Sequence, residues 1–308
     1  LRDTDVFQNT SGYGMFTGGL GFQYGAEKLG ALTVPAAAGN TKRQIKFITD
    51  FGTTCLHIIP SYATRLAEVM YEEGIDPRKD TKLHTVCIGA EPHSEEQRKR
   101  IEQLLGVKAY NCFGMSEMNG PGVAFECTEQ NGLHIWEDNV IVEIVDPVTL
   151  QPVPEGEVGE LVLTTINREA MPLLRYRTRD LLPGDCPCGR THKRLARFKG
   201  RSDDMIILKG VNLFPIQIEK ILMQFKELGS NYLITLETIG NSDEMLIEVE
   251  LSDLFTDDYS ALQRLTKGIT RQLKDELLLT PRIKLVAKGS LPTTDGKAVR
   301  VKDHRKLC

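Results

Sequence analysis

Short apolar runs and longer amphipathic stretches alternate along residues 32–111. Apolar, β-branched runs predict strands, and apolar residues at every third or fourth position predict helices. Ser61 and Ser94 stand where helix N-caps are expected, Ser94 with Gln97 in capping-box spacing. This order predicts an α/β domain on a mainly parallel sheet, with ligands beyond the carboxyl ends of its strands. The predicted strands are 32–34, 55–59, 85–88 and 107–111, and the predicted helices are 41–51, 61–74 and 94–106.

The pattern changes twice further along the chain. Alternating apolar and polar residues with turn signals over 139–166 predict a hairpin-rich β subdomain. Near the C-terminus the order β-α-β-β-α-β is a split βαβ arrangement, typical of a small α+β domain. Residues 291–300 are too polar and turn-rich to belong to its core. The elements predicted there are strand 205–208, helix 216–228, strands 232–237 and 245–251, helix 257–279 and strand 283–287.

A charged segment separates these two regions. Arg201, Asp203 and Asp204 precede an apolar strand, and Lys209-Gly210 follows it. Charged residues between two cores resist burial, so such a junction can stay hydrated and change its backbone dihedrals. An ordinary charged linker is the alternative interpretation. We expect two domains, a partial large one over residues 1–202 and a small mobile one over residues 203–308.

The composition of the 308 residues is that of a globular protein, with 41% hydrophobic residues. A net charge of -4 gives no general attraction for nucleic acid or anionic lipid, and no apolar run approaches membrane-spanning length. Seven unevenly spaced cysteines do not indicate a disulfide framework. We find no signal peptide and expect a cytoplasmic protein without a nucleic-acid or membrane partner. Because the sequence opens at Leu1, we expect it to be part of a longer protein.

Residues 11–30 combine seven glycines with four aromatic side chains. Glycine lets a backbone approach another backbone or a ligand closely, and aromatic rings offer flat apolar surface. Two interpretations remain open: tight helix packing inside a domain, or one wall of a pocket for an aromatic substrate. The aromatic residues are Tyr13, Phe16, Phe22 and Tyr24.

Four segments together resemble the adenylate-forming superfamily of acyl-CoA synthetases: YNCFGMSE (110–117), RYRTRD (175–180), GRSDDMIILKG (200–210) and PTTDGK (292–297). Within that superfamily the chain is most similar to the phenylacetate-CoA ligases. Three further segments carry this similarity: TSGYGMFTGGLGFQYGAEKLG from Thr10, FGMSEMNGPGV from Phe113 and RSDDMIILKGVNLFP from Arg201. The resemblance covers essentially the whole chain. It implies that residues 1–202 bind AMP and the acyl group.

Activation of a carboxylate by ATP brings two anions together, so the site must neutralise charge and align the reactants. The resemblance implies that Ser116 contacts phosphate oxygens and that Glu117 binds Mg²⁺, for which a carboxylate is suited. An exposed polar turn is the alternative for this pair. Lys297 would bridge the substrate carboxylate and the α-phosphate as a compact point charge. The implied nucleotide-binding residues are Gly89, Ala90 and Glu91 against adenine, Asp180 on the ribose, Arg201 on ribose or phosphate, and Asn111, Cys112, Phe113 and Gly114.

The resemblance also implies a second half-reaction. The small domain would rotate about Asp203, withdraw Lys297 and bring the Lys209-Gly210 loop to the path of the CoA thiol. Small residues beside an aromatic ring leave a flat slot that favours an aryl acid, and the polar Asn111 would also suit a hydroxylated or heteroaromatic acid. The implied acyl-binding residues are Tyr13, Phe16, Gly89, Ala90, Asn111 and Pro121.

A metal site is predicted independently of this resemblance. Cys186 and Cys188 form a knuckle-like pair, and with Cys127 and His134 they would make a closed tetrahedral Zn²⁺ site. His192 is the alternative nitrogen ligand, and reduced surface cysteines are the alternative to any metal. Four protein ligands leave no open position, so the ion would be structural. Cys55, Cys87 and Cys112 lie on apolar strands and are expected in the core.

We therefore expect an ATP-dependent ligase that joins an aryl acid, phenylacetate first among them, to coenzyme A through an acyl-adenylate. It would release AMP and pyrophosphate, and a homodimer is expected. Two alternatives remain: transfer of the acyl group to a carrier protein, and a nucleotide- or acyl-binding module without catalysis. The glycine-rich phosphate loop of the superfamily would precede Leu1, so we expect this polypeptide alone to be weakly active. The basic run 189–201 is expected to be a solvated face that attracts phosphates.

Overall fold

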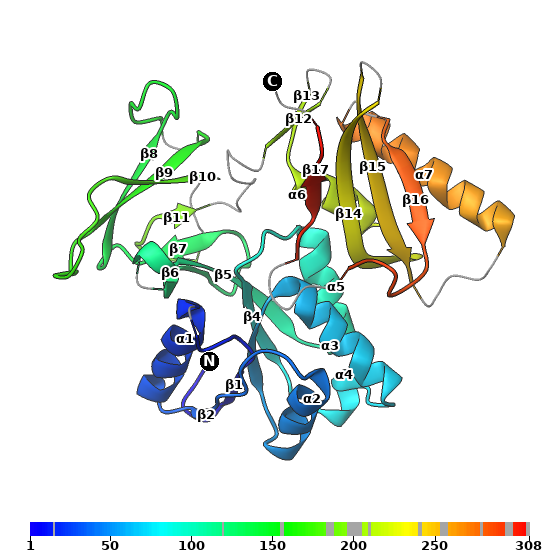
Figure 1. Cartoon of the computed structure of the whole chain (residues 1–308). Coiled ribbons are helices and arrows are strands. Elements are labelled where there is room, and N and C mark those ends of the chain that lie inside the picture. Colours follow the sequence, from blue (N-terminus) through cyan, green and yellow to red (C-terminus); the bar gives the residue numbers. More distant parts are fainter. Residues whose placement is uncertain are drawn as a thin grey trace. The chain divides into compact units, whose positions relative to one another are not determined.

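The computed structural model forms two compact units, each described below by itself (Figure 1). The first comprises Leu1–Pro92 and Ile101–Asp203, and the second His93–Arg100 and Asp204–Cys308. Only the backbone is described for residues 179–182, 207 and 212. The structure describes residues 1–14, 16–118, 120–154, 157–182, 188–195, 205–208, 211–239, 242–252, 258–277, 280–292 and 298–305.

An eight-stranded sheet in the order β11-β7-β6-β5-β4-β3-β1-β2 organises the first unit. Strands β1 to β5 pair in parallel, whereas β6, β7 and β11 extend the sheet antiparallel. The sheet is therefore mixed, because the short connection from β5 to β6 permits only an antiparallel pairing. Its strands are β1 (Val6–Asn9), β2 (Leu32–Val34), β3 (Cys55–Ile58), β4 (Thr85–Gly89), β5 (Lys108–Met115), β6 (Gly120–Glu126), β7 (Leu133–Ile135) and β11 (Arg194–Leu195).

The three predicted helices, at 41–51, 61–74 and 94–106, are present, whereas α1 and α4 were not predicted. Ser94 is confirmed as an N-cap, since its hydroxyl accepts a hydrogen bond of 3.1 Å from the Gln97 amide. The prediction for Ser61 is wrong: Pro60 opens that helix after Ile59, and Ser61 lies in its first turn. The helices are α1 (Thr17–Leu29), α2 (Thr41–Asp50), α3 (Pro60–Glu72), α4 (Pro77–Asp80) and α5 (Glu95–Leu105), followed by the 3₁₀ turn η1 (Ser116–Met118).

Two large apolar clusters, and a smaller one around Phe7, hold the first unit together. The first joins β3 and β4 to α3, and its largest side chains, such as Leu56, Ile88 and Met70, are fully buried. The second joins β6 and β7 to a separate three-stranded antiparallel sheet in the order β10-β9-β8. Burial of each large aliphatic side chain stabilises the fold by about 1.5–3 kcal/mol. The strands of the smaller sheet are β8 (Val140–Val145), β9 (Gly159–Thr165) and β10 (Tyr176–Leu182).

The second unit is built on a four-stranded sheet in the order β16-β15-β14-β17 (Figure 1). Residues of both long helices, including Ile221, Ile269 and Leu273, form one core with the sheet residues Ile234 and Ile247. The elements are β12 (Ile206–Leu208), β13 (Val211–Leu213), α6 (Pro215–Leu222), β14 (Leu228–Ile239), β15 (Ser242–Leu251), α7 (Tyr259–Leu277), β16 (Arg282–Val286) and β17 (Val301–Asp303). None of the described helices combines the length and apolar character that a bilayer crossing requires.

The split βαβ prediction needs two corrections. The first predicted strand, β12, pairs with β13 in a separate hairpin, and β17 takes the sheet position beside β14. An edge strand tolerates polar residues, and only Val301 of β17 packs against the core, which is why the polar tail did not predict it. Helix α6 ends at Leu222 and not at Leu228, because Leu228 is buried as the first residue of β14.

Glu219 on α6 offers a test of the second core. The carboxyl is buried and accepts a hydrogen bond of 3.1 Å from the Tyr232 hydroxyl. Burial raises the pKa of Glu219, against the opposing effect of its hydrogen bonds and of Arg300. A raised native pKa means that the native state binds more protons, so this contribution to stability is lost as pH rises through the native pKa.

Replacing Glu219 with glutamine should therefore stabilise the second unit increasingly as pH rises. The gain in unfolding free energy should grow by at most about 1.4 kcal/mol per pH unit. Urea unfolding at about pH 5 and about pH 8, monitored by hydrogen exchange in β14, measures this gain in unfolding free energy. The exposed Glu227→Gln is the matched control. An equal pH response of both variants would contradict the prediction.

Candidate functional site

The turn after β4 and the strand β5 meet at one edge of the large sheet. Gly89 pairs with Cys112, and Ile88 with Asn111. A Cβ at Gly89 would lie 2.3 Å from the Cys112 carbonyl oxygen, so this approach requires glycine. Ala90 follows with φ of 66°, in the left-handed region. The structure thus brings together Gly89, Ala90, Asn111 and Cys112, at the strand ends where the sequence places a ligand site.

Glu91 has a defined partner within this unit. Its carboxylate accepts hydrogen bonds of 3.0 Å from the Ser61 amide and 2.9 Å from the Ser61 hydroxyl. Ser61 lies in the first turn of α3, where a negative charge is favourable. Glu91 therefore fixes the turn 89–91 to α3, and its contact with adenine stays a prediction.

Ser116 and Glu117 follow directly on β5, in the turn η1, and both are exposed. The Arg168 guanidinium donates a hydrogen bond to the Glu117 backbone carbonyl. The Thr17 hydroxyl, at the start of α1, lies 3.4 Å from the Ser116 hydroxyl. Two long-range contacts therefore position this turn. Neither Arg168 nor Thr17 was predicted, and Thr17 had a signal only in its place within the glycine-rich segment.

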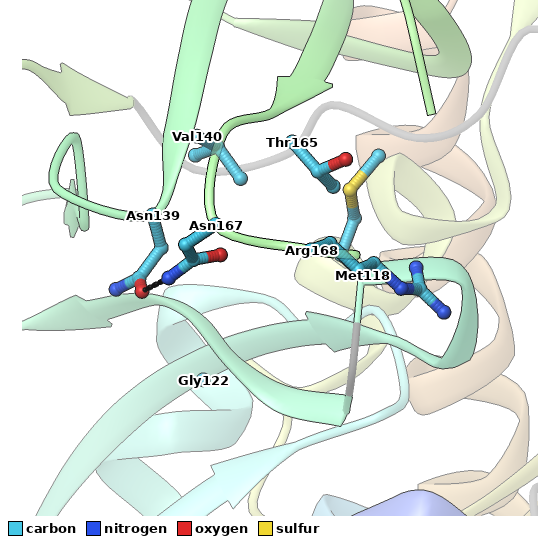
Figure 2. Close-up of a pocket in the computed structure, with 7 residues that line it drawn as sticks. All are labelled: Met118, Gly122, Asn139, Val140, Thr165, Asn167 and Arg168. Atoms are coloured by element: carbon cyan, nitrogen blue, oxygen red, sulfur yellow. Dashed lines mark hydrogen bonds between the residues drawn. The ribbon is translucent and has the colours of Figure 1, made fainter. Parts of the chain in front are cut away.

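A small cavity of about 200 Å³ lies beside Arg168 (Figure 2). Asn139 and Asn167 are joined across one side of it by a hydrogen bond. Ligand pockets usually enclose about 300–1,000 Å³, so this cavity is smaller than a site for an aryl acid. It is lined by Met118, Gly122, Asn139, Val140, Thr165, Asn167 and Arg168.

The glycines of α1 allow close packing, which supports the first interpretation of the segment. A Cβ at Gly19 would lie 2.3 Å from the Gly12 carbonyl oxygen, and one at Gly21 would lie 2.5 Å from Cδ of Pro121. Pro121 in turn lies against Gly114, so α1, β5 and β6 meet at this point. The second interpretation stays a prediction, because it depends on Phe16, which is 37% exposed at the start of α1.

A buried polar network of Asn9 and His57 contacts the glycine-rich segment. Asn9 ends β1 and pairs with His57 of β3. The Asn9 side-chain nitrogen donates to the Gly19 carbonyl at 2.6 Å, and its oxygen accepts from the Ser11 amide at 3.2 Å and lies 3.1 Å from Nδ1 of His57. Nδ1 of His57 also lies 3.0 Å from the Ser11 hydroxyl, so two side chains hold the imidazole. Phe22 of α1 stacks on the imidazole with ring centroids 3.7 Å apart.

Burial governs the titration of this network. It lowers the pKa of His57 to about 3, so the imidazole is neutral at physiological pH. Burial also raises the pKa of Tyr13, a predicted acyl-binding residue. Its hydroxyl is buried and has no hydrogen-bond partner among the described residues. Sequence reasoning missed Asn9 and His57 because their pairing depends on strands far apart in the chain.

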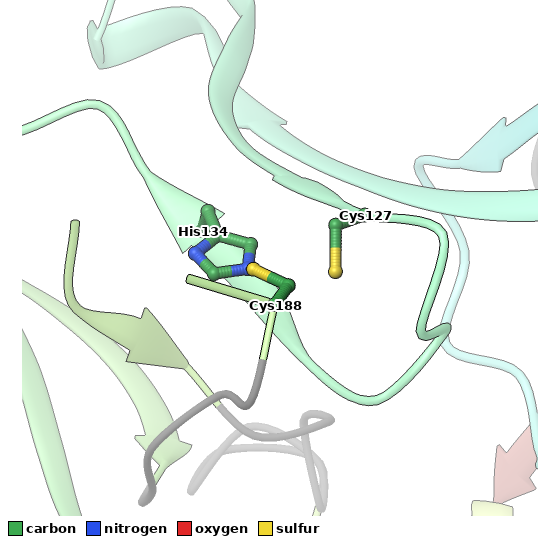
Figure 3. A group of neighbouring side chains, drawn as sticks. All are labelled: Cys127, His134 and Cys188. Carbon is green, nitrogen blue, oxygen red and sulfur yellow. The ribbon is translucent and has the colours of Figure 1, made fainter. Parts of the chain in front are cut away.

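Cys127, His134 and Cys188 lie together, as predicted (Figure 3). One ligand atom of each lies within 4.8 Å of the other two, and Sγ of Cys188 is 3.2 Å from Nε2 of His134. His192, the alternative ligand, instead places its ring 5.5 Å from that of Trp136. Cys55 and Cys112 are buried in the core, as expected, and Cys87 is half-buried.

Several predicted site residues cannot be placed. The side chain of Asp180 lies outside the described residues, although the backbone of its strand β10 is described. Six further residues also lie outside the described ranges: Cys186, Arg201, Asp203, Lys209, Gly210 and Lys297.

Comparison with known families agrees with this geometry. A family model described as AMP-binding enzyme matches residues 2–167, and the C-terminal domain of AMP-binding enzymes matches residues 210–305. The fold is thus that of an adenylate-forming enzyme.

Among curated proteins, the phenylacetate-coenzyme A ligase of Pseudomonas putida is 43% identical over 99% of this chain and 70% of its own length. The ligase of the same name from Thermus thermophilus is 42% identical over 98% of this chain and 72% of its own. The chain belongs to the phenylacetate-coenzyme A ligase family of AMP-binding enzymes. At the level of the family, these findings confirm the expected AMP-forming acid–thiol ligase.

Solved structures extend the comparison. A 2-hydroxyisobutyryl-CoA ligase, crystallised with R3-HIB-AMP in the postadenylation state, matches with a TM-score of 0.92 and 30% identity. The match covers 98% of this chain, which spans 66% of that ligase. A benzoate CoA ligase from Burkholderia xenovorans LB400 matches with a TM-score of 0.70 at 20% identity, over 96% of this chain and 60% of its own, and supports the fold alone.

Acid should weaken the first unit through His57. Its native pKa of about 3 lies below the ordinary histidine value of 6.5, so below about pH 6.5 the unfolded chain binds a proton that the native state does not. Stability should fall towards about pH 3 by up to about 1.4 kcal/mol per pH unit. His57→Gln should weaken this dependence of stability on pH. Urea unfolding, monitored by the fluorescence of Trp136, the only tryptophan, measures it. His304→Gln, at an exposed position, is the matched control, and an unchanged slope in His57→Gln would refute the assignment.

Proposed function

We propose that the complete protein activates an aryl carboxylic acid with ATP and passes the acyl group to coenzyme A. Phenylacetate is the first candidate, because relatives 40–43% identical carry that name. The observation that carries the proposal is the convergence of the turn 89–91 and the exposed pair Ser116-Glu117 at one sheet edge. Parallel strands bind ligands at that edge.

Ser116 and Glu117 would face the nucleotide phosphates. Arg168 holds the backbone of their turn, which leaves the exposed hydroxyl of Ser116 able to donate to a phosphate oxygen. The Glu117 carboxylate is exposed and offers hard oxygen ligands, so it fits Mg²⁺. When bound, Mg²⁺ would offset phosphate charge and so reduce the repulsion between the two reacting anions.

Residues outside the described ranges would complete the nucleotide site. Asp180 would accept hydrogen bonds from the ribose hydroxyls, and Arg201 would contact ribose or phosphate. Lys297 would align the acid carboxylate with the α-phosphate. For thioester formation, the chain would pivot at Asp203 and present the Lys209-Gly210 loop to the thiol. These roles are what the resemblance of segments 175–180, 200–210 and 292–297 implies.

The acyl group would lie where α1, β5 and β6 meet. Phe16 and Tyr13 would supply flat surface on one side, and Pro121 the other. Asn111 pairs with Ile88, the residue before Gly89, and would contribute a polar contact to the acyl group. The Asn9–His57 network would fix this wall, because it holds the Gly19 carbonyl and stacks on Phe22. A homodimer and a cytoplasmic location also stay predictions.

A panel of aryl acids, assayed on the full-length protein with ATP and CoA, tests the proposal. Phenylacetate should give the highest kcat/KM for pyrophosphate release and an equimolar CoA thioester. Glu117→Gln should lower kcat by about 100-fold or more, whereas the exposed Glu129→Gln should leave it unchanged. Nucleotide binding without pyrophosphate release would overturn the proposal, as would adenylation without a CoA thioester.

Arg168 should act as a positioning residue for Ser116 and Glu117. Removing its guanidinium in Arg168→Ala frees the η1 turn, so kcat for adenylation should fall by about 10- to 100-fold. The KM for the aryl acid should change little, and Arg168→Lys should restore part of the rate. A general loss of structure would instead lower the unfolding temperature, lower kcat and raise the KM for the aryl acid. Arg271→Ala, at an exposed site in α7, is the matched control.

A further inference from the structure

Three soft metal ligands converge on the antiparallel end of the large sheet. Cys127 follows β6, His134 lies within β7 and Cys188 precedes β11. These strands are neighbours, since His134 pairs with Phe125 of β6 on one side and with Arg194 of β11 on the other. Strand pairing therefore brings together side chains that are far apart in sequence (Figure 3).

Their separations fit a tetrahedral ion. Zn²⁺ binds thiolate sulfur at about 2.3 Å and imidazole nitrogen at about 2.0–2.1 Å, which places neighbouring ligand atoms about 3.5–3.8 Å apart. The three ligand atoms here lie within 4.8 Å of one another, and Cys188 Sγ is 3.2 Å from Nε2 of His134. Shifts of a few tenths of an ångström to about one ångström would bring them to a common ion.

The ligand set selects the ion and its role. Two sulfurs and one imidazole suit Zn²⁺, and the cluster holds no carboxylate among the described residues, so a hard cation such as Mg²⁺ does not fit. Cys127 is 5% and His134 is 1% exposed, so the site is closed to substrates. The burial of these two ligands indicates a structural ion and not a catalytic one.

We propose that Cys127, His134 and Cys188 bind one structural Zn²⁺ ion. The ion would join the end of β6 to the segment that enters β11. It would also link His134 to Cys188, which are 54 positions apart in the sequence. Within the described residues, strand β11 comprises Arg194 and Leu195, which pair with His134 and Leu133 of β7. A metal crosslink beside it would hold this edge strand on β7. The proposal does not depend on the ligase activity.

Metal analysis of the purified full chain provides the test. After expression with zinc and dialysis against a weak chelator, we expect about one Zn²⁺ per chain. Cys188→Ser and Cys127→Ser should each lower zinc affinity by about 10- to 100-fold or more, as loss of a ligand does. Cys87→Ser, a half-buried cysteine outside the cluster, is the matched control and should keep the ion.

Two further measurements sharpen the result. Co²⁺ in place of zinc should give the intense visible bands of a tetrahedral site and a thiolate charge-transfer band, both lost in Cys188→Ser. Cys186→Ser should weaken binding and His192→Ala should not, if the fourth ligand is the cysteine that the sequence predicts; the reverse result would assign it to His192.

Three results would overturn the proposal. One is a chain that holds less than about a tenth of an equivalent of zinc after metal-replete expression. Another is equal zinc content in Cys188→Ser and Cys87→Ser. The third is a disulfide between Cys127 and Cys188, detected by mass spectrometry of the unreduced protein, because a disulfide would remove both thiolates.

Discussion

The close backbone approach of Gly89 to Cys112 is the constraint on which the site depends. Any side chain at position 89 would collide with the Cys112 carbonyl, 2.3 Å from the place of its Cβ. Because the two strands are parallel, both leave the sheet at the same edge, and their turns carry Ala90 and Ser116 there. The ligand site is thus a consequence of strand pairing, and each turn then needs only local fixing. Ser61 fixes one through Glu91, and Arg168 fixes the other.

Much of this arrangement could be predicted from sequence, because strand and helix periodicity is local. The alternation along residues 32–111 predicts β2 to β5 but not β1, and parallel strands place the loops after β4 and β5 together. What could not be predicted depends on contacts across the chain. Arg168 reaches a carbonyl 51 residues away, and Thr17 a hydroxyl 99 residues away. Likewise β17 joins its sheet through pairing with Ile234, which no pattern in the polar tail specifies.

The buried Asn9–His57 pair explains why the glycine-rich segment can carry so few side chains and still be ordered. Glycine has a high conformational entropy in the unfolded chain, so a segment rich in it needs fixed partners. Asn9 supplies one through the Gly19 carbonyl, and the neutral imidazole of His57 supplies another through its stack on Phe22. A protonated imidazole would be strongly unfavourable at that depth, so the network favours one charge state.

The segments that hydrogen bonds hold in place and the residues assigned by resemblance would have different roles in the reaction. Adenylation and thioester formation both require that the nucleotide and acyl group stay in place, and every described anchor acts on the segments proposed to hold them: residues 11–22, 89–91 and 116–118. Under the proposed function, Lys297 and the Lys209-Gly210 loop would each be needed in only one step. Two consecutive reactions at one site require fixed groups that serve both steps and exchangeable groups that serve one. A zinc ion beside β11 would serve the rigid side of this division, because it would crosslink strands of the sheet that bears the shared groups.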